Sequence, residues 1–144
     1  MIAPCCLHAI IALTLAGPVQ TDARPANLEE LRSRAAEQAY FADSPAILNE
    51  LVKAGGKTAI PILEQLLRDE KTYWNNLGLN LDDADKIPAV RIERTLALLE
   101  HLATLGYRDR GHIVRDLRDQ FRDHPLFQHE TRVIEMAEAL LSSR

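Results

Sequence analysis

The sequence predicts an all-α fold in which antiparallel helix hairpins stack as a short α-solenoid or helical bundle. Good helix formers dominate the composition, in which 47% of residues are hydrophobic and 26% are charged. Apolar residues recur at helical spacing, and no stretch shows the alternation with period two that predicts a β-strand. Most of the six glycines stand where apparent helices end. These observations together predict helices and argue against an all-β domain.

The first 23 residues form a segment of their own. Residues 2–16 are almost wholly apolar, but the apolar core is shorter than the roughly 20 residues that a membrane span needs. Small residues at Thr21 and Ala23 fit the cleavage site of an exported protein. We expect residues 1–23 to be a signal peptide and residues 24–144 to be a single helical domain, periplasmic or secreted after cleavage. No Lys or Arg precedes the apolar run, so a core helix or a membrane-anchoring tail is the alternative.

Charge and cysteine content restrict the partners. The formal net charge is -4, so there is no surplus of Lys and Arg to neutralise phosphates, and we expect no nucleic-acid partner. Both cysteines, Cys5 and Cys6, fall in the expected signal peptide. The mature chain would then hold neither a thiol nucleophile nor a Cys metal ligand. We expect no stable membrane span in the mature chain and leave a homo-oligomer open.

Three helices are predicted in the first half of the mature chain. The first starts at Asn27, where Glu30 completes a capping-box pattern. The second starts at Ser44, which would cap it, with a Pro at the favoured first position. The third covers about residues 58–70. The apolar stripes of these helices contain Leu28, Leu31, Ala35, Ala39, Ile47, Leu48, Leu51, Val52, Ile60, Leu63, Leu66 and Leu67.

A Gly-Lys-Thr triplet stands between the second and third predicted helices. A phosphate-binding loop needs a Gly five positions before Gly56, where Leu51 stands, and a strand rather than a helix in front of it. We therefore interpret the segment as a turn. Gly55 and Gly56 would end one helix, Thr58 would cap the next by accepting from a backbone amide, and Pro61 would lie in its first turn.

Three more helices are predicted at about residues 88–105, 111–122 and 130–141. Gly106 ends the first of these and Pro125 ends the second. Their inward stripes contain Ile92, Leu96, Leu99, Leu102, Ala103, Ile113, Val114, Leu117, Phe121, Val133, Ile134, Ala137, Leu140 and Leu141.

An internal repeat relates the middle helices at an offset of about 51 residues. Leu51 matches Leu102, and Gly55 matches Gly106, in the same apolar phase. Each copy is a helix, a Gly-containing turn and a second helix. Such a hairpin buries its apolar faces only when a neighbour stacks on it.

The stretch SPAILNELVKAGGKTAIPILEQLLRDE, residues 44–70, resembles a HEAT-type repeat. Such repeats pair two helices around a short turn and often carry a Pro near the start of the second helix, as Pro61 does here. The resemblance is weaker over residues 89–123, where Gly111 and His112 stand near the position of that Pro. It implies an α-solenoid used for protein binding, and it implies no catalytic residue.

The link at residues 71–88 is the first candidate binding site, because it is longer than helix connections usually are and carries the only Trp. The alternative is that this Trp packs back over the helices. A calcium loop starting at Asp82 would put Ile87 where Gly is required, so we expect no calcium site. The predicted partner-binding residues of the link are Tyr73, Trp74, Asn75, Asn76, Asp82 and Asp83.

A basic stripe on the fifth predicted helix is the second candidate. Its cations recur at helical spacing beside a matching acidic stripe of Asp116, Asp119 and Asp123. Matched stripes indicate a solvated face, and the alternative is an electrostatic docking face for a protein. The predicted partner-binding residues here are Arg115, Arg118 and Arg122.

Residues with catalytic or metal-binding chemistry form no clear site. His124 and His129 lie near two carboxylates, but a Pro separates them and their spacing does not suit one helical face. No Ser stands in a nucleophile elbow. We therefore expect no enzyme, no cofactor and no metal. The predicted function is an exported, non-catalytic protein-binding module. The alternatives are a periplasmic inhibitor or immunity protein that blocks a toxin or enzyme, and a small metal-dependent hydrolase.

Overall fold

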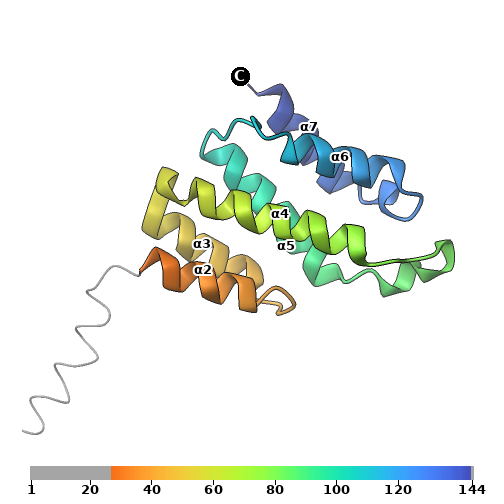
Figure 1. The fold of residues 1–144 in the computed structure, drawn as a ribbon, viewed down its shortest axis with the longest axis horizontal. Coiled ribbons are helices and arrows are strands. Elements are labelled where there is room, and N and C mark those ends of the chain that lie inside the picture. Colours follow the sequence, from red (N-terminus) through yellow and green to blue (C-terminus); the bar gives the residue numbers. More distant parts are fainter. Residues whose placement is uncertain (1–26, 144) are drawn as a thin grey trace, which may run out of the picture.

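The computed structural model describes residues 27–143, and within that range the chain is helical with no strand, which confirms the all-α prediction (Figure 1). The expected signal peptide lies outside the described residues. The α-helices are α2 (Leu28–Glu37), α3 (Ser44–Gly55), α4 (Ile60–Asn76), α5 (Ala89–Thr104), α6 (Ile113–Asp123) and α7 (Thr131–Ser142). Short 3-10 helices are η1 (Gly56–Ala59), η2 (Leu81–Lys86) and η3 (Phe127–His129). In the described part, no helix is both long enough and apolar enough for a membrane span.

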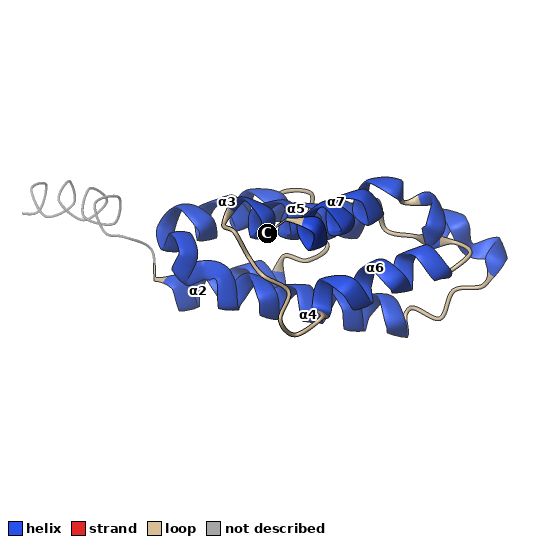
Figure 2. Ribbon diagram, turned by 90° about the horizontal axis from the view of Figure 1, so that it is seen from above, coloured by secondary structure: helices blue, strands red, loops and turns tan. Residues whose placement is uncertain are grey.

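The helices form two layers, with α2, α4 and α6 in one and α3, α5 and α7 in the other (Figure 2). Successive helices alternate between the layers, so α2 packs on α3, α4 on α5 and α6 on α7. Within its layer α5 contacts both α3 and α7. The arrangement is a stack of three helix hairpins, compatible with the predicted helical bundle or solenoid. The predicted pairing within the repeat is wrong: it joined α3 to α4 and α5 to α6, whereas α4 packs mainly on α5 and α6 mainly on α7. The specific resemblance to HEAT repeats stays a prediction.

The core lies between the two layers and is centred on α5, which has neighbours on three sides. Leu98, Leu99 and Leu102 of this helix are fully buried. Burial of each such side chain stabilises the fold by about 1.5–3 kcal/mol relative to exposure. A buried stripe one residue wide could not meet three neighbours, and for this reason buried residues lie around much of α5, with Arg91, Arg94 and Thr95 among them.

The structure confirms one predicted helix cap and contradicts another. Asn27 caps α2 as predicted, because its side chain accepts from the amide of Glu29 at 2.9 Å. The predicted capping role of Ser44 is wrong. Asp43 occupies the cap position of α3, and the Ser44 hydroxyl is buried and accepts from Nη1 of Arg94 at 2.7 Å. A tertiary contact therefore uses the side chain that the local pattern had assigned to the helix end.

The Gly-Lys-Thr segment is a turn, as predicted, but its details differ. Gly56 has a φ of 53°, and Gly55 keeps a φ of -109° as the last residue of α3. Thr58 lies in η1, and its hydroxyl donates to the carbonyl of Gly55 at 2.6 Å instead of accepting from an amide. The predicted capping role of Thr58 is therefore wrong.

The end of α5 follows the prediction closely. Gly106 adopts a φ of 76°, and its amide donates to the carbonyl of Ala103 at 3.1 Å. The next amide, that of Tyr107, reaches back to the carbonyl of Leu102 at 2.9 Å. This pair of bonds is a Schellman motif, which needs a residue that tolerates positive φ.

The helix predicted at residues 58–70 is longer than expected, since α4 continues to Asn76. The inward stripe of Leu63 and Leu67 extends through Glu70 to Trp74 at spacings of three and four. The link to α5 therefore spans residues 77–88 and contains η2. The predicted eighteen-residue link is too long, because the buried stripe continues past Glu70 to Trp74 and keeps the chain helical to Asn76.

Candidate functional site

A buried ionic cluster joins α4 to α5. Glu70 of α4 is fully buried, and its carboxylate accepts from two guanidinium groups of α5. Arg91 binds it through both oxygens, with Nη2 at 2.8 Å and Nε at 3.0 Å. Arg94 donates through Nε at 2.9 Å and is only 1% exposed. One buried carboxylate thus holds two cations that stand three residues apart on one helix.

Neutral side chains extend this cluster to a third helix. Arg94 donates to the Ser44 hydroxyl, which ties α3 to α5. The Thr95 hydroxyl lies 3.2 Å from Glu70 and 2.9 Å from the carbonyl of Arg91. Burial lowers the pKa of Arg94 from its ordinary value, and the charge of Glu70 opposes that shift. The polar atoms are paired with one another, which is the condition under which buried charge is tolerated.

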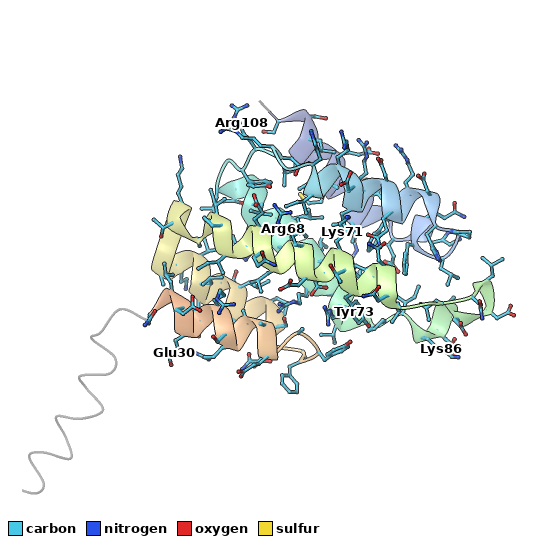
Figure 3. All side chains as sticks on the ribbon, viewed as in Figure 1. Glu30, Arg68, Lys71, Tyr73, Lys86 and Arg108 are labelled. Carbon is cyan, nitrogen blue, oxygen red and sulfur yellow. The ribbon has the colours of Figure 1, made fainter. Side chains whose placement is uncertain are left out.

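Two tyrosine rings cover the open side of the cluster. The guanidinium carbon of Arg91 lies 3.8 Å from the ring centroid of Tyr73 and 4.8 Å from that of Tyr40. These are cation–π distances, and they offset part of the excess positive charge of two arginines on one carboxylate. Burial raises the pKa of the Tyr73 hydroxyl to about 12, with a contribution from hydrogen bonding to Tyr40. Figure 3 shows Tyr73 beside the turn that joins α2 to α3.

That turn exposes two aromatic side chains. Tyr40 is 59% exposed and Phe41 is 58% exposed. The Tyr40 ring also packs on two residues beneath the surface. It meets the Tyr73 ring edge-on, with ring centroids 5.7 Å apart, and it stacks on the guanidinium of Arg91. We call Tyr40 and Phe41 the aromatic turn. It combines exposed apolar area with a fixed position. It lies outside the helical pattern of α2, so no periodicity in the sequence marks it.

Trp74 was expected on a loop, but it lies in α4 and is only 3% exposed. Its ring packs edge-on against Phe121 and Phe127, with centroids 5.6 Å and 5.3 Å away. Its indole Nε1 donates to the Thr95 hydroxyl at 3.1 Å. The structure therefore places Trp74 in the core, which matches the packing alternative for this residue.

The other residues predicted on the link are scattered. Asn75 accepts from Gln120 of α6 at 2.7 Å, and Asn76 is exposed at the end of α4. Asp83 accepts from the amide of Asn80 at 2.8 Å, so it closes the start of η2. That bond lowers the pKa of Asp83 below its ordinary value. Asp82 is exposed on the same turn. The structure does not bring these side chains together.

The three predicted arginines do share α6, and each has an acidic neighbour. Arg115 pairs with Asp116 at 3.4 Å. Arg118 and Arg122 both pair with Asp119, at 2.9 Å and 3.1 Å. Exposed pairs of this kind contribute little to stability, and they cancel much of the positive charge that an acidic partner would need. The solvated-face interpretation therefore fits the geometry better than the docking-face interpretation.

The candidate metal ligands are also apart. His124 stacks on Phe127, with ring centroids 4.6 Å away, and its Nδ1 accepts from the amide of Leu126 at 3.1 Å. Within residues 27–143, no group of three His, Cys, Asp or Glu side chains is placed to hold a metal ion. The role of His124 in this arrangement is to close a turn.

One sequence signal for the ionic cluster does exist. Glu70 occupies the inward stripe of α4, seven residues after Leu63 and four before Trp74. A single acid on an apolar stripe predicts a buried cation opposite, although not which one. The geometry of the cluster serves to fasten three helices and to support the aromatic turn. Comparisons with protein-family models, with curated proteins and with solved structures find no match to this chain.

Proposed function

We propose that this chain is an exported, non-catalytic protein-binding module and that the aromatic turn is its anchor. The observation that carries the proposal is the exposure of Tyr40 and Phe41 side by side on a supported turn. Aromatic side chains are enriched among the residues that carry binding energy at protein interfaces.

Support beneath the turn makes it a good anchor. Tyr40 lies against Tyr73 and over Arg91, and Arg91 is itself fixed by Glu70. A side chain that is already ordered loses less conformational entropy on binding, so more of its contact energy appears as affinity. The buried ionic cluster thus contributes to function by holding the anchor in place.

Photo-crosslinking tests the aromatic turn. A photoreactive phenylalanine analogue at Phe41 is expected to give a discrete covalent adduct in the native host. The same analogue at Leu81 tests the linking segment, because Leu81 is 68% exposed there. The matched control is the analogue at Glu30, which is exposed on α2. Adducts at Glu30 equal to those at Phe41 would contradict the proposal, and adducts at Leu81 alone would move the anchor to the linking segment.

Export is the second part of the proposal and rests on the sequence of residues 1–23. N-terminal sequencing of the protein purified from its native host is expected to begin near Arg24. A protein that retains Met1 would contradict export and leave the binding proposal standing.

A further inference from the structure

Helices α5 and α7 are neighbours in one layer (Figure 2). A groove lies between them. It has a volume of about 460 Å³. The residues that line it are Leu96, Glu100, Arg132, Glu135, Met136 and Ala139. None of them belongs to the ionic cluster or to the aromatic turn, so this is a separate surface.

A smaller hollow of about 160 Å³ continues the groove toward the start of both helices. The two hollows share Arg132, and the smaller one reaches Ile87 and Ile92. We call the combined surface the α5–α7 track. From Ala89 to Glu100 the track follows twelve residues of α5, which is about 18 Å of helix.

The wider hollow of the track has a mainly apolar floor, and the rim of the whole track is acidic. Ile92, Leu96 and Met136 contribute apolar side chains. Carboxylates surround them at Glu93, Glu100, Glu130 and Glu135. The lining contains one cation, Arg132, whose guanidinium pairs with Glu93 across the two helices. In the described part of the chain, the other three carboxylates of the rim form no ion pair.

We propose that the α5–α7 track binds an amphipathic helix of a partner protein, with Lys or Arg on both sides of its apolar stripe. The proposal rests on the proposed protein-binding function and names the chemistry of the partner. An apolar furrow between two helices accepts the apolar face of a third helix, with anchors at spacings of three and four. Cations flanking that face would meet the unpaired carboxylates of Glu100, Glu130 and Glu135.

The acidic charge of the α5–α7 track also disfavours other classes of partner. A second copy of this chain carries the same excess of acid, with a net charge of -4, and would bring like charges together. Nucleic acid and anionic lipid present phosphates, which the acidic rim repels. An extended peptide has no strand edge to join in the described residues, since they form helices and turns.

Designed peptides provide the probe. A labelled helical peptide of about four turns carries Leu at spacings of three and four and Lys on both flanks. We expect this peptide to bind the full chain in a fluorescence anisotropy titration, with affinity that falls as salt is added. A matched peptide with Glu in place of every Lys is expected not to bind. Equal binding of the two peptides would overturn the role of charge.

Charge reversal on the protein identifies the surface. The double variant Glu100→Lys, Glu135→Lys is expected to bind the basic peptide at least about tenfold more weakly and to gain affinity for the acidic one. The matched control, Glu30→Lys, Glu37→Lys, makes the same charge change on exposed positions of α2 and is expected to bind normally. Circular dichroism checks that both variants keep their helices. Equal loss in both variants would overturn the assignment to the track.

Two further outcomes separate this proposal from the proposed function. If neither peptide binds while adducts form at Phe41, the track proposal fails and protein binding stands. If the wild-type chain dimerises in sedimentation and the Glu100→Lys, Glu135→Lys variant does not, a second copy is the occupant, which overturns the partner helix. If peptides do not bind and crosslinking gives no specific adduct, both proposals fail.

Discussion

Replacement of Glu70 by Gln is expected to lower the free energy of unfolding by about 3–5 kcal/mol, because it leaves two buried guanidinium groups without their counter-ion. Arg91 and Arg94 both bind this carboxylate, and neither can give up its proton to escape the low-dielectric interior. Gln keeps the volume of the side chain, so the loss reports on charge and not on packing. Helix-helix contact between α4 and α5 should weaken together with the support of Tyr40.

Urea denaturation followed by circular dichroism measures this loss. The matched control is Glu29→Gln, which removes an exposed carboxylate paired with Arg32 on the surface of α2. Because an exposed ion pair contributes little to stability, we expect a much smaller loss from this control than from Glu70→Gln. A loss at Glu70 no larger than the loss at Glu29 would show that the buried cluster does not hold the three helices together.

The fold was predictable because its signals are local. Apolar spacing and the glycines at positions 55, 56 and 106 mark the helices and their turns, and the structure has helices in all six predicted places. The turn at the Gly-Lys-Thr triplet was also recognisable from the Leu51 that a phosphate loop does not tolerate. The local signals gave wrong predictions for two small polar side chains. Ser44 and Thr58 both look like helix caps, and both bond elsewhere.

The ionic cluster could not be predicted in the same way. Glu70 lies 21 residues before Arg91 and 24 residues before Arg94, so no spacing rule within one helix connects them. Their pairing depends on how α4 docks on α5, which is a property of the whole stack. Near the start of a helix, two arginines spaced three residues apart are typical of a solvated face. Only their burial in the assembled structure shows the opposite.

The candidate binding surfaces could not be predicted from the sequence for a related reason. Exposure of Tyr40 and Phe41 depends on the turn after α2, where the chain leaves the helical pattern and sequence periodicity gives no information. The acidic rim of the α5–α7 track combines residues of α5 with residues of α7. Glu93, Glu100 and Glu135 are each exposed positions on their own helix. The furrow between them exists only because the two helices are neighbours in one layer.

Truncation of Trp74 to Ala is expected to cost about 3–5 kcal/mol of unfolding free energy, since it opens a cavity between α4 and the aromatic rings of Phe121 and Phe127. It also leaves the Thr95 hydroxyl without the donor that the indole supplies. The variant Trp74→Phe keeps most of the ring and loses that hydrogen bond. We therefore expect it to cost about 0.5–1.5 kcal/mol for the bond, plus a smaller packing loss than Ala.

Urea denaturation followed by circular dichroism ranks the two variants without relying on the lost fluorophore. In the wild-type chain Trp74 is the only Trp, so its emission should be that of a buried indole and resist quenching by acrylamide. We expect Trp74→Phe to fold and to keep full binding of any partner that crosslinks at Phe41. A different result would contradict the buried position of Trp74. If both variants kept the wild-type free energy of unfolding and both lost the partner, the indole would be an exposed binding anchor. That result would restore the function predicted for residues 71–88, because a side chain packed against Phe121 and Phe127 cannot be removed at no cost in stability.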